Sequence, residues 1–145
     1  MNIDMTRLVT ADQKAAQALA AAQGAARARL VAAIEGFSEK VTGDVPLSEK
    51  LSWGTKEMAA RAVLAGAGSA EDKALLQGEA KVTGEAVSDL AARIVRNSDT
   101  YRGLVAMLTG LRRGAEAAIA AARTPSEADA VADAALVRLN AADLT

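Results

Sequence analysis

The stretch LAARIVRNSDTYRGLVAMLTGLRRGAEAAIAAA, residues 90–122, decides the fold of this chain. Small or apolar residues recur in it at alternating steps of four and three, at Leu90, Ile94, Asn97, Tyr101, Leu104, Leu108, Leu111, Ala115, Ala118 and Ala122. Such steps keep residues on one side of a helix, and a stripe this long needs a second helix to cover it. The sequence therefore predicts a long helix that packs lengthwise against another helix.

Capping and turn residues divide the rest of the chain into further helices. Thr10 with Gln13 forms a reciprocal capping pattern, Ser69 precedes acidic residues, and Thr124 is followed by Pro125 and Glu127. Glycine- and proline-containing segments separate the helices, and no alternation typical of strands occurs. We therefore expect five helices, at residues 11–41, 46–66, 69–83, 85–123 and 125–142.

The predicted fold is all-α, a single helical module over residues 1–145. Two long helices, 11–41 and 85–123, would form an elongated hairpin or bundle with coiled-coil-like packing, and shorter helices complete it. Because residues 19–41 carry a similar stripe, the long helix can pair within the chain or between chains. A compact, alanine-rich bundle is the alternative. Residues 1–10 are interpreted as a docking arm, with a frayed terminus as the alternative.

The composition removes most catalytic and metal chemistry. The 145 residues include no Cys and no His, so a thiol nucleophile, an imidazole base and the usual zinc ligands are all missing. Carboxylate pairs or Lys could still act chemically, but no motif indicates that they do. We expect no enzyme, no catalytic or metal site and no cofactor.

Alanine makes up about a quarter of the chain. Alanine favours helix formation but buries little area, so the helices should form readily around a thin core. A thin core in a short chain favours oligomerisation or docking onto a partner. We expect protein partners, either copies of the chain itself or other proteins, and a homo-oligomer.

The candidate protein-interaction residues lie on the long helix and at the single tryptophan. Leu104, Leu108 and Leu111 should form the centre of the packing seam. Asn97 either fixes the register of a buried seam or marks a bend or wet patch. Trp53 is either a partner anchor or a plug in the core. The full set is Leu90, Ile94, Asn97, Tyr101, Leu104, Leu108, Leu111 and Trp53.

Three glycines interrupt the long helix at Gly103, Gly110 and Gly114. Each costs about 1 kcal/mol relative to Ala in a helix interior. We interpret them as sites where another backbone approaches closely, with helix kinks as the alternative.

Nucleic acid and membrane are disfavoured as partners. The net charge is −1, and the arginines of residues 93–123 scatter over several positions around the helix. The longest uncharged run, residues 15–26, is too short to span a bilayer. The N-terminus lacks a basic region followed by an apolar run, so we expect no secretory signal. A nucleic-acid-binding regulator remains the third functional alternative.

Several stretches resemble small helical proteins of the tail and tail-fibre gene clusters of tailed bacteriophages. They are LSWGTKEMAARA at 51–62, LAARIV at 90–95, YRGL at 101–104 through LRR at 111–113, and TPSE at 124–127. The resemblance implies a structural component of the virion tail, or a chaperone that assembles the tail fibre. It implies a location in the virion, or in the host cytoplasm during assembly, and no catalytic residues.

Overall fold

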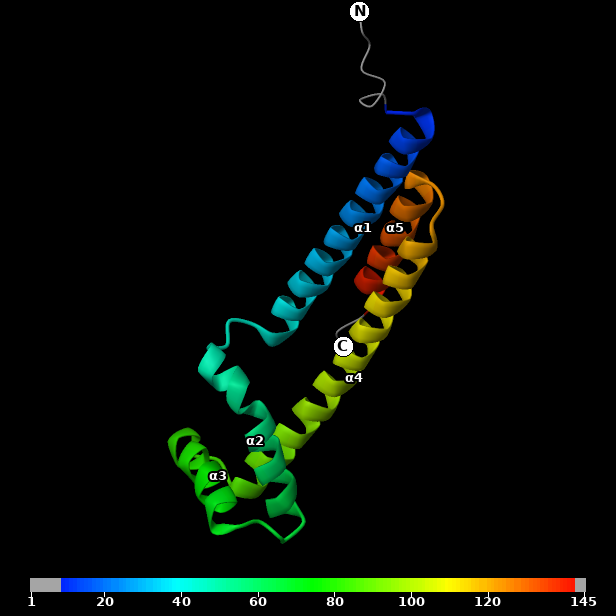
Figure 1. Cartoon of the computed structure of the whole chain (residues 1–145). Coiled ribbons are helices and arrows are strands. Elements are labelled where there is room, and N and C mark those ends of the chain that lie inside the picture. Colours follow the sequence, from blue (N-terminus) through cyan, green and yellow to red (C-terminus); the bar gives the residue numbers. More distant parts are fainter. Residues whose placement is uncertain (1–8, 143–145) are drawn as a thin grey trace, which may run out of the picture. The chain divides into compact units, whose positions relative to one another are not determined.

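A computed structural model describes residues 9–142, and within that range the chain forms five α-helices and no strand. They are α1 (Ala11–Thr42), α2 (Leu47–Leu64), α3 (Ala70–Thr83), α4 (Val87–Ala121) and α5 (Pro125–Ala141) (Figure 1). The all-α prediction is confirmed. No described helix is both long and apolar enough to cross a membrane. Residues 1–8, which include most of the predicted docking arm, lie outside the described residues.

The helix starts follow the capping chemistry of the sequence. Thr10 and Gln13 bond reciprocally, with the Thr10 amide donating to Oε1 at 2.9 Å and the Gln13 amide donating to Oγ1 at 3.1 Å. Ser69 and Asp72 form the same capping box at α3. Thr124 accepts a bond from the Glu127 amide at 3.1 Å, with Pro125 in the first turn of α5.

The helix ends differ from the expected ranges by one or two residues. The second helix, expected to run to residue 66, ends at Leu64, because Gly66 takes a left-handed conformation with a φ of 72°. The long helix, expected over 85–123, begins at Val87 and ends at Ala121.

The chain divides into two compact units, where the sequence predicts one module. Among the described residues, unit 1 comprises 9–42 and 108–142, and unit 2 comprises 43–107. Helix α4 contributes its residues up to Met107 to unit 2 and those from Leu108 onward to unit 1.

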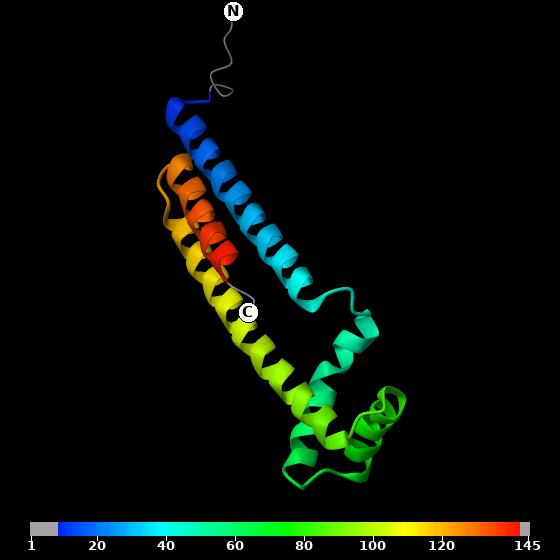
Figure 2. The ribbon, with the colours of Figure 1, turned by 180° about the vertical axis from the view of Figure 1, so that it is seen from behind.

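Unit 1 is a three-helix arrangement. Helix α1 runs antiparallel to the C-terminal part of α4, and α5 lies alongside both (Figure 1 and Figure 2). The Gln23 amide donates to the carbonyls of Ile119 at 3.1 Å and Ala122 at 3.3 Å, which satisfies acceptors at the C-terminal end of α4. Arg29 pairs with Asp133 and, at 3.7 Å, with Asp129. The buried cluster consists of Ala26, Leu30, Ala115, Ile119, Ala128, Ala132 and Ala135.

Unit 2 packs α2 and α3 against the N-terminal part of α4. Lys56 of α2 forms an ion pair with Glu79 of α3 at 2.7 Å. The buried cluster consists of Ala59, Ala60, Leu76, Ala80, Leu90 and Ala91, with Val63, Val87, Ile94 and Val95 packed against it. Both units are therefore held by cores in which alanine faces a few larger side chains.

We expect Leu30→Ala to lower the free energy of unfolding by about 2–5 kcal/mol. Leu30 has no exposed surface and is one of the two largest side chains in the unit 1 core, so its truncation leaves a cavity among alanines that cannot refill it. Urea denaturation followed by circular dichroism measures the loss. Val137→Ala, on the exposed surface of α5, is the control and should change stability by no more than about 0.5 kcal/mol. Equal effects of the two changes would contradict this assignment of the core.

Candidate protein-interaction surface

The apolar residues of the predicted seam lie largely inside the chain's own two units. Leu90 is fully buried and Ile94 half-buried against the unit 2 cluster. Leu108 is buried, and Leu111 packs against the unit 1 cluster. Leu104 is half-buried. The helices of the same chain thus cover much of the stripe.

Asn97 does not take up the buried position that a register-fixing asparagine requires. Its side chain is exposed in the single chain. The polar contacts at this level of α4 come instead from Ser98 and Asp99, which bond to α2. The wet-patch alternative describes the single chain better.

No other part of the described chain closely approaches the glycines of α4. A Cβ added at Gly103, Gly110 or Gly114 would meet no atom within 4 Å outside the local helix. Among the described residues, therefore, no other backbone uses the space that these glycines leave.

Trp53 and Tyr101 form an aromatic pair that joins α2 to α4 within unit 2. Their ring centroids lie 5.7 Å apart at an interplanar angle of 80°, which is an edge-to-face arrangement. Trp53 is half-buried, and Tyr101 is 37% exposed. The sequence marked both residues as candidates but gave no sign that they touch.

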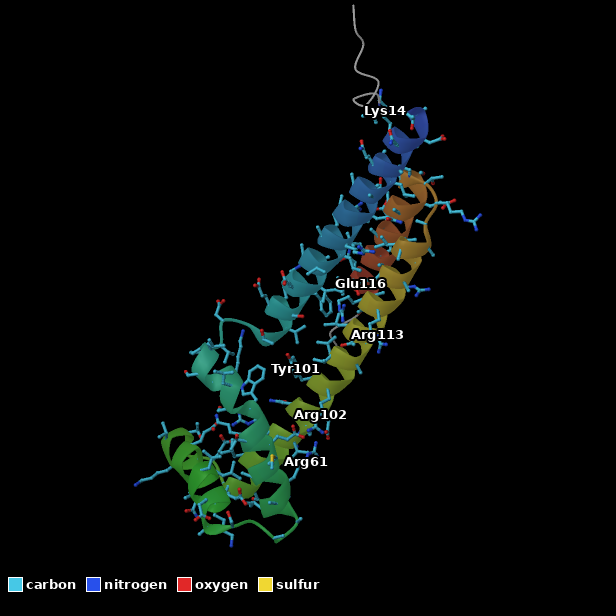
Figure 3. All side chains as sticks on the ribbon, in the orientation of Figure 1. Lys14, Arg61, Tyr101, Arg102, Arg113 and Glu116 are labelled. Atoms are coloured by element: carbon cyan, nitrogen blue, oxygen red, sulfur yellow. The ribbon has the colours of Figure 1, made fainter. Side chains whose placement is uncertain are left out.

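Glu57 lies beside this pair and is the centre of a polar network that the sequence reasoning missed. Glu57 is the only buried charged residue within residues 9–142, and 5% of its surface is exposed. Its carboxylate accepts hydrogen bonds from the Ser98 hydroxyl and from Arg61 Nε at 2.8 Å, and it forms an ion pair with Arg102 Nη2 at 2.7 Å. Arg61 also pairs with Asp99. Figure 3 shows Arg61 on α2, and Tyr101 and Arg102 on α4.

The network keeps Glu57 ionised. The hydrogen bonds from Ser98 and then Arg61 lower the pKa of Glu57 below its ordinary value of 4.5, although burial acts in the opposite direction. The pKa of Arg61 is raised in turn by its bonds to Glu57 and Asp99. Each charge is thus matched by a partner across the α2–α4 contact.

This arrangement fits molecular recognition. Tryptophan, tyrosine and arginine dominate the energetic centres of protein interfaces, and Trp53, Tyr101 and Arg102 are partly accessible on adjoining helices. Within 9–142, no group of three or more acidic side chains is placed to hold a metal ion.

Several arginines that could have served a nucleic-acid surface are engaged with carboxylates. Arg93 bonds to Glu85 at 2.6 Å, and Arg112 to Glu116 at 2.8 Å, in addition to the pairs of Arg61 and Arg102 with Glu57. Phosphate contacts by these side chains would compete with those ion pairs.

Comparison with known proteins adds no assignment, because no protein family, curated protein or solved structure matches the chain.

We expect Glu57→Gln to reduce the dependence of stability on pH. Because the pKa of Glu57 is lower in the folded state, its stabilising effect is complete above about pH 4.5 and is lost as the pH falls through the folded pKa. The free energy of unfolding of the wild type should therefore fall more steeply than that of the variant as the pH drops below 4.5. Ser98→Ala should give an intermediate slope, since it removes only one donor. Parallel pH profiles for all three proteins would show that the network does not hold the carboxylate.

Proposed function

We propose that this chain is a non-enzymatic structural component of a tailed-phage virion, in the tail or tail-fibre region, and that it acts through helix–helix association. The observation that supports helix–helix association is a set of large apolar side chains on an outer helix face. Leu47 is 71% exposed, Leu51 75% and Met58 74%. Their spacing places these three side chains on one face of α2, and a contiguous exposed apolar face is typical of a surface that a partner covers.

The composition of the cores supports the same proposal. Alanine-lined cores bury little area per helix, so further burial against a partner would add a substantial share of the total stability. The partners we propose are copies of the chain, other tail proteins, or both.

The virion location rests on the resemblance of residues 51–62, 90–95, 101–113 and 124–127 to small helical proteins of phage tail gene clusters. The first of these stretches contains Trp53, Glu57 and Arg61, which are the α2 residues of the aromatic pair and the polar network. We extend the proposal to the architecture expected from the sequence, an elongated hairpin with coiled-coil-like packing.

A tail-fibre assembly chaperone is the second candidate. The aromatic pair favours it, because Trp53 and Tyr101 are only partly covered and could bind a partner transiently. A chaperone would act in the host cytoplasm during assembly and leave before the particle is complete.

Quantitative mass spectrometry of purified phage particles separates the two candidates. A structural component should be present at a fixed copy number comparable to that of other tail proteins. A chaperone should be found in infected-cell extract and be missing from the particles. Absence from particles purified from the phage that encodes the chain would contradict the structural proposal.

A further inference from the structure

The two halves of α2 are held within unit 2 by different kinds of contact. The apolar cluster of the unit takes its α2 members from Ala59 onward, with Val63 packed against it. Earlier in the helix, the large side chains of Leu47 and Leu51 are 71% and 75% exposed. Residues 47–57, which we call the N-terminal half of α2, therefore lie outside the apolar core of their unit.

A groove lies between this half and α3. Its volume is about 490 Å³, and Ser48 and Ser52 of α2 face Thr83 of α3 across it. The ion pair of Lys56 with Glu79, at 2.7 Å, also lines the groove, and both side chains are partly open to water. Because the groove is open, α3 gives the N-terminal half little apolar support.

Helix α4 holds this half through one aromatic contact and one polar network. Trp53 packs edge to face on Tyr101, and the Glu57 carboxylate accepts the Ser98 hydroxyl bond and pairs with Arg102. The partners of Glu57 differ from it in burial. The arginine side chains of the network are 41% and 65% exposed, whereas that of Glu57 is 7% exposed.

We propose that Glu57 is an acid-sensitive latch, whose protonation releases the N-terminal half of α2 from α4 and exposes Trp53 and Tyr101. Hydrogen bonds to a charged acceptor are roughly twice as strong as those between neutral groups, so a protonated Glu57 holds its partners weakly. The two arginines can then turn into water, where they are already partly solvated. The core from Ala59 onward keeps the rest of the helix in place.

The charged groups that face Glu57 set the direction of the response. Arg61 faces it from α2 and Arg102 from α4, while Asp99 of α4 reaches it through Arg61. The arginines stay charged at any accessible pH. The bonds from Ser98 and then Arg61 lower the pKa of Glu57 in the folded state below 4.5. The latch is therefore complete above about pH 4.5 and is lost as the pH falls through the folded pKa.

This inference rests on the contacts within unit 2 and not on the proposed function. Absence of the chain from phage particles would leave the latch unaffected. A latch that fails to open would leave the choice between a structural component and a chaperone unchanged. The two proposals therefore fail by different experiments.

Trp53 is the only tryptophan of the chain, so its fluorescence reports the opening directly. As the full chain is acidified below pH 4.5, the Trp53 emission should shift to the red and acrylamide should quench it more strongly, because the indole enters water. Most of the helicity measured by circular dichroism should remain. An emission that is constant down to about pH 3, or that changes only together with the loss of helicity, would overturn the proposal.

Two variants of the latch make opposite changes to this titration. Glu57→Gln cannot ionise, so its emission should be red-shifted already at neutral pH and should not respond to acid. In the same variant, amide protection of residues 47–57 at neutral pH should fall on the order of tenfold or more, with α3 unchanged. Ser98→Ala keeps the carboxylate but removes a bond that lowers its pKa, so its transition should move to higher pH. An unchanged transition in both variants would refute the latch.

Neighbouring carboxylates provide the matched controls. Glu79→Gln breaks the ion pair between α2 and α3, and it should leave the fluorescence transition in place. Asp99→Asn should also keep a transition, since Glu57 still titrates. Loss of the transition in either variant would assign the response to that carboxylate and contradict the assignment to Glu57.

Discussion

The packing of helices through alanine is the constraint on which the rest of this structure depends. Nine of the fifteen buried apolar residues in the described chain are alanines, distributed over both units. Alanine lets helix backbones approach closely and costs little entropy in forming the helix, but each buried methyl group removes little area from water. The few large core residues, such as Leu30, Leu76, Leu90 and Ile119, consequently carry a disproportionate share of the stability. Because the large core residues are few, burial of further apolar surface against a partner would add to the stability of the fold.

Because methyl groups discriminate poorly between alternative registers, polar contacts are well suited to specify the helix pairings. In unit 2, Glu57 ties α2 to Ser98 and Arg102 of α4, and Arg61 reaches Asp99. In unit 1, the Gln23 amide holds the last carbonyls of α4. These bonds need particular residues at particular levels, so a helix that slides by one turn loses them. Buried polar groups can serve this role at some cost in stability.

The sequence predicted the elements well because caps and apolar spacing are local signals. Thr10, Ser69 and Thr124 bond as their spacing implies, and the helices end within two residues of the expected positions. Contacts between distant segments could not be predicted in this way. The Glu57–Arg61 spacing was visible as an i, i+4 pair, but Ser98, which completes the site, lies 41 residues away. The stripe of α4 likewise gave no sign that Leu90 and Leu111 would be covered by different units, and it left open whether Asn97 would be buried in a seam or lie on a wet patch.

The helices of this chain are apolar on more sides than its own cores bury, and α2 and α4 are the clearest examples. Hydrogen–deuterium exchange measured at low and high protein concentration tests that account most directly. It predicts that amide protection rises with concentration in residues 47–58, where Leu47, Leu51 and Met58 are exposed, while the amides of α3 stay unchanged. Protection that is independent of concentration, or that rises in α3 and not in residues 47–58, would contradict it.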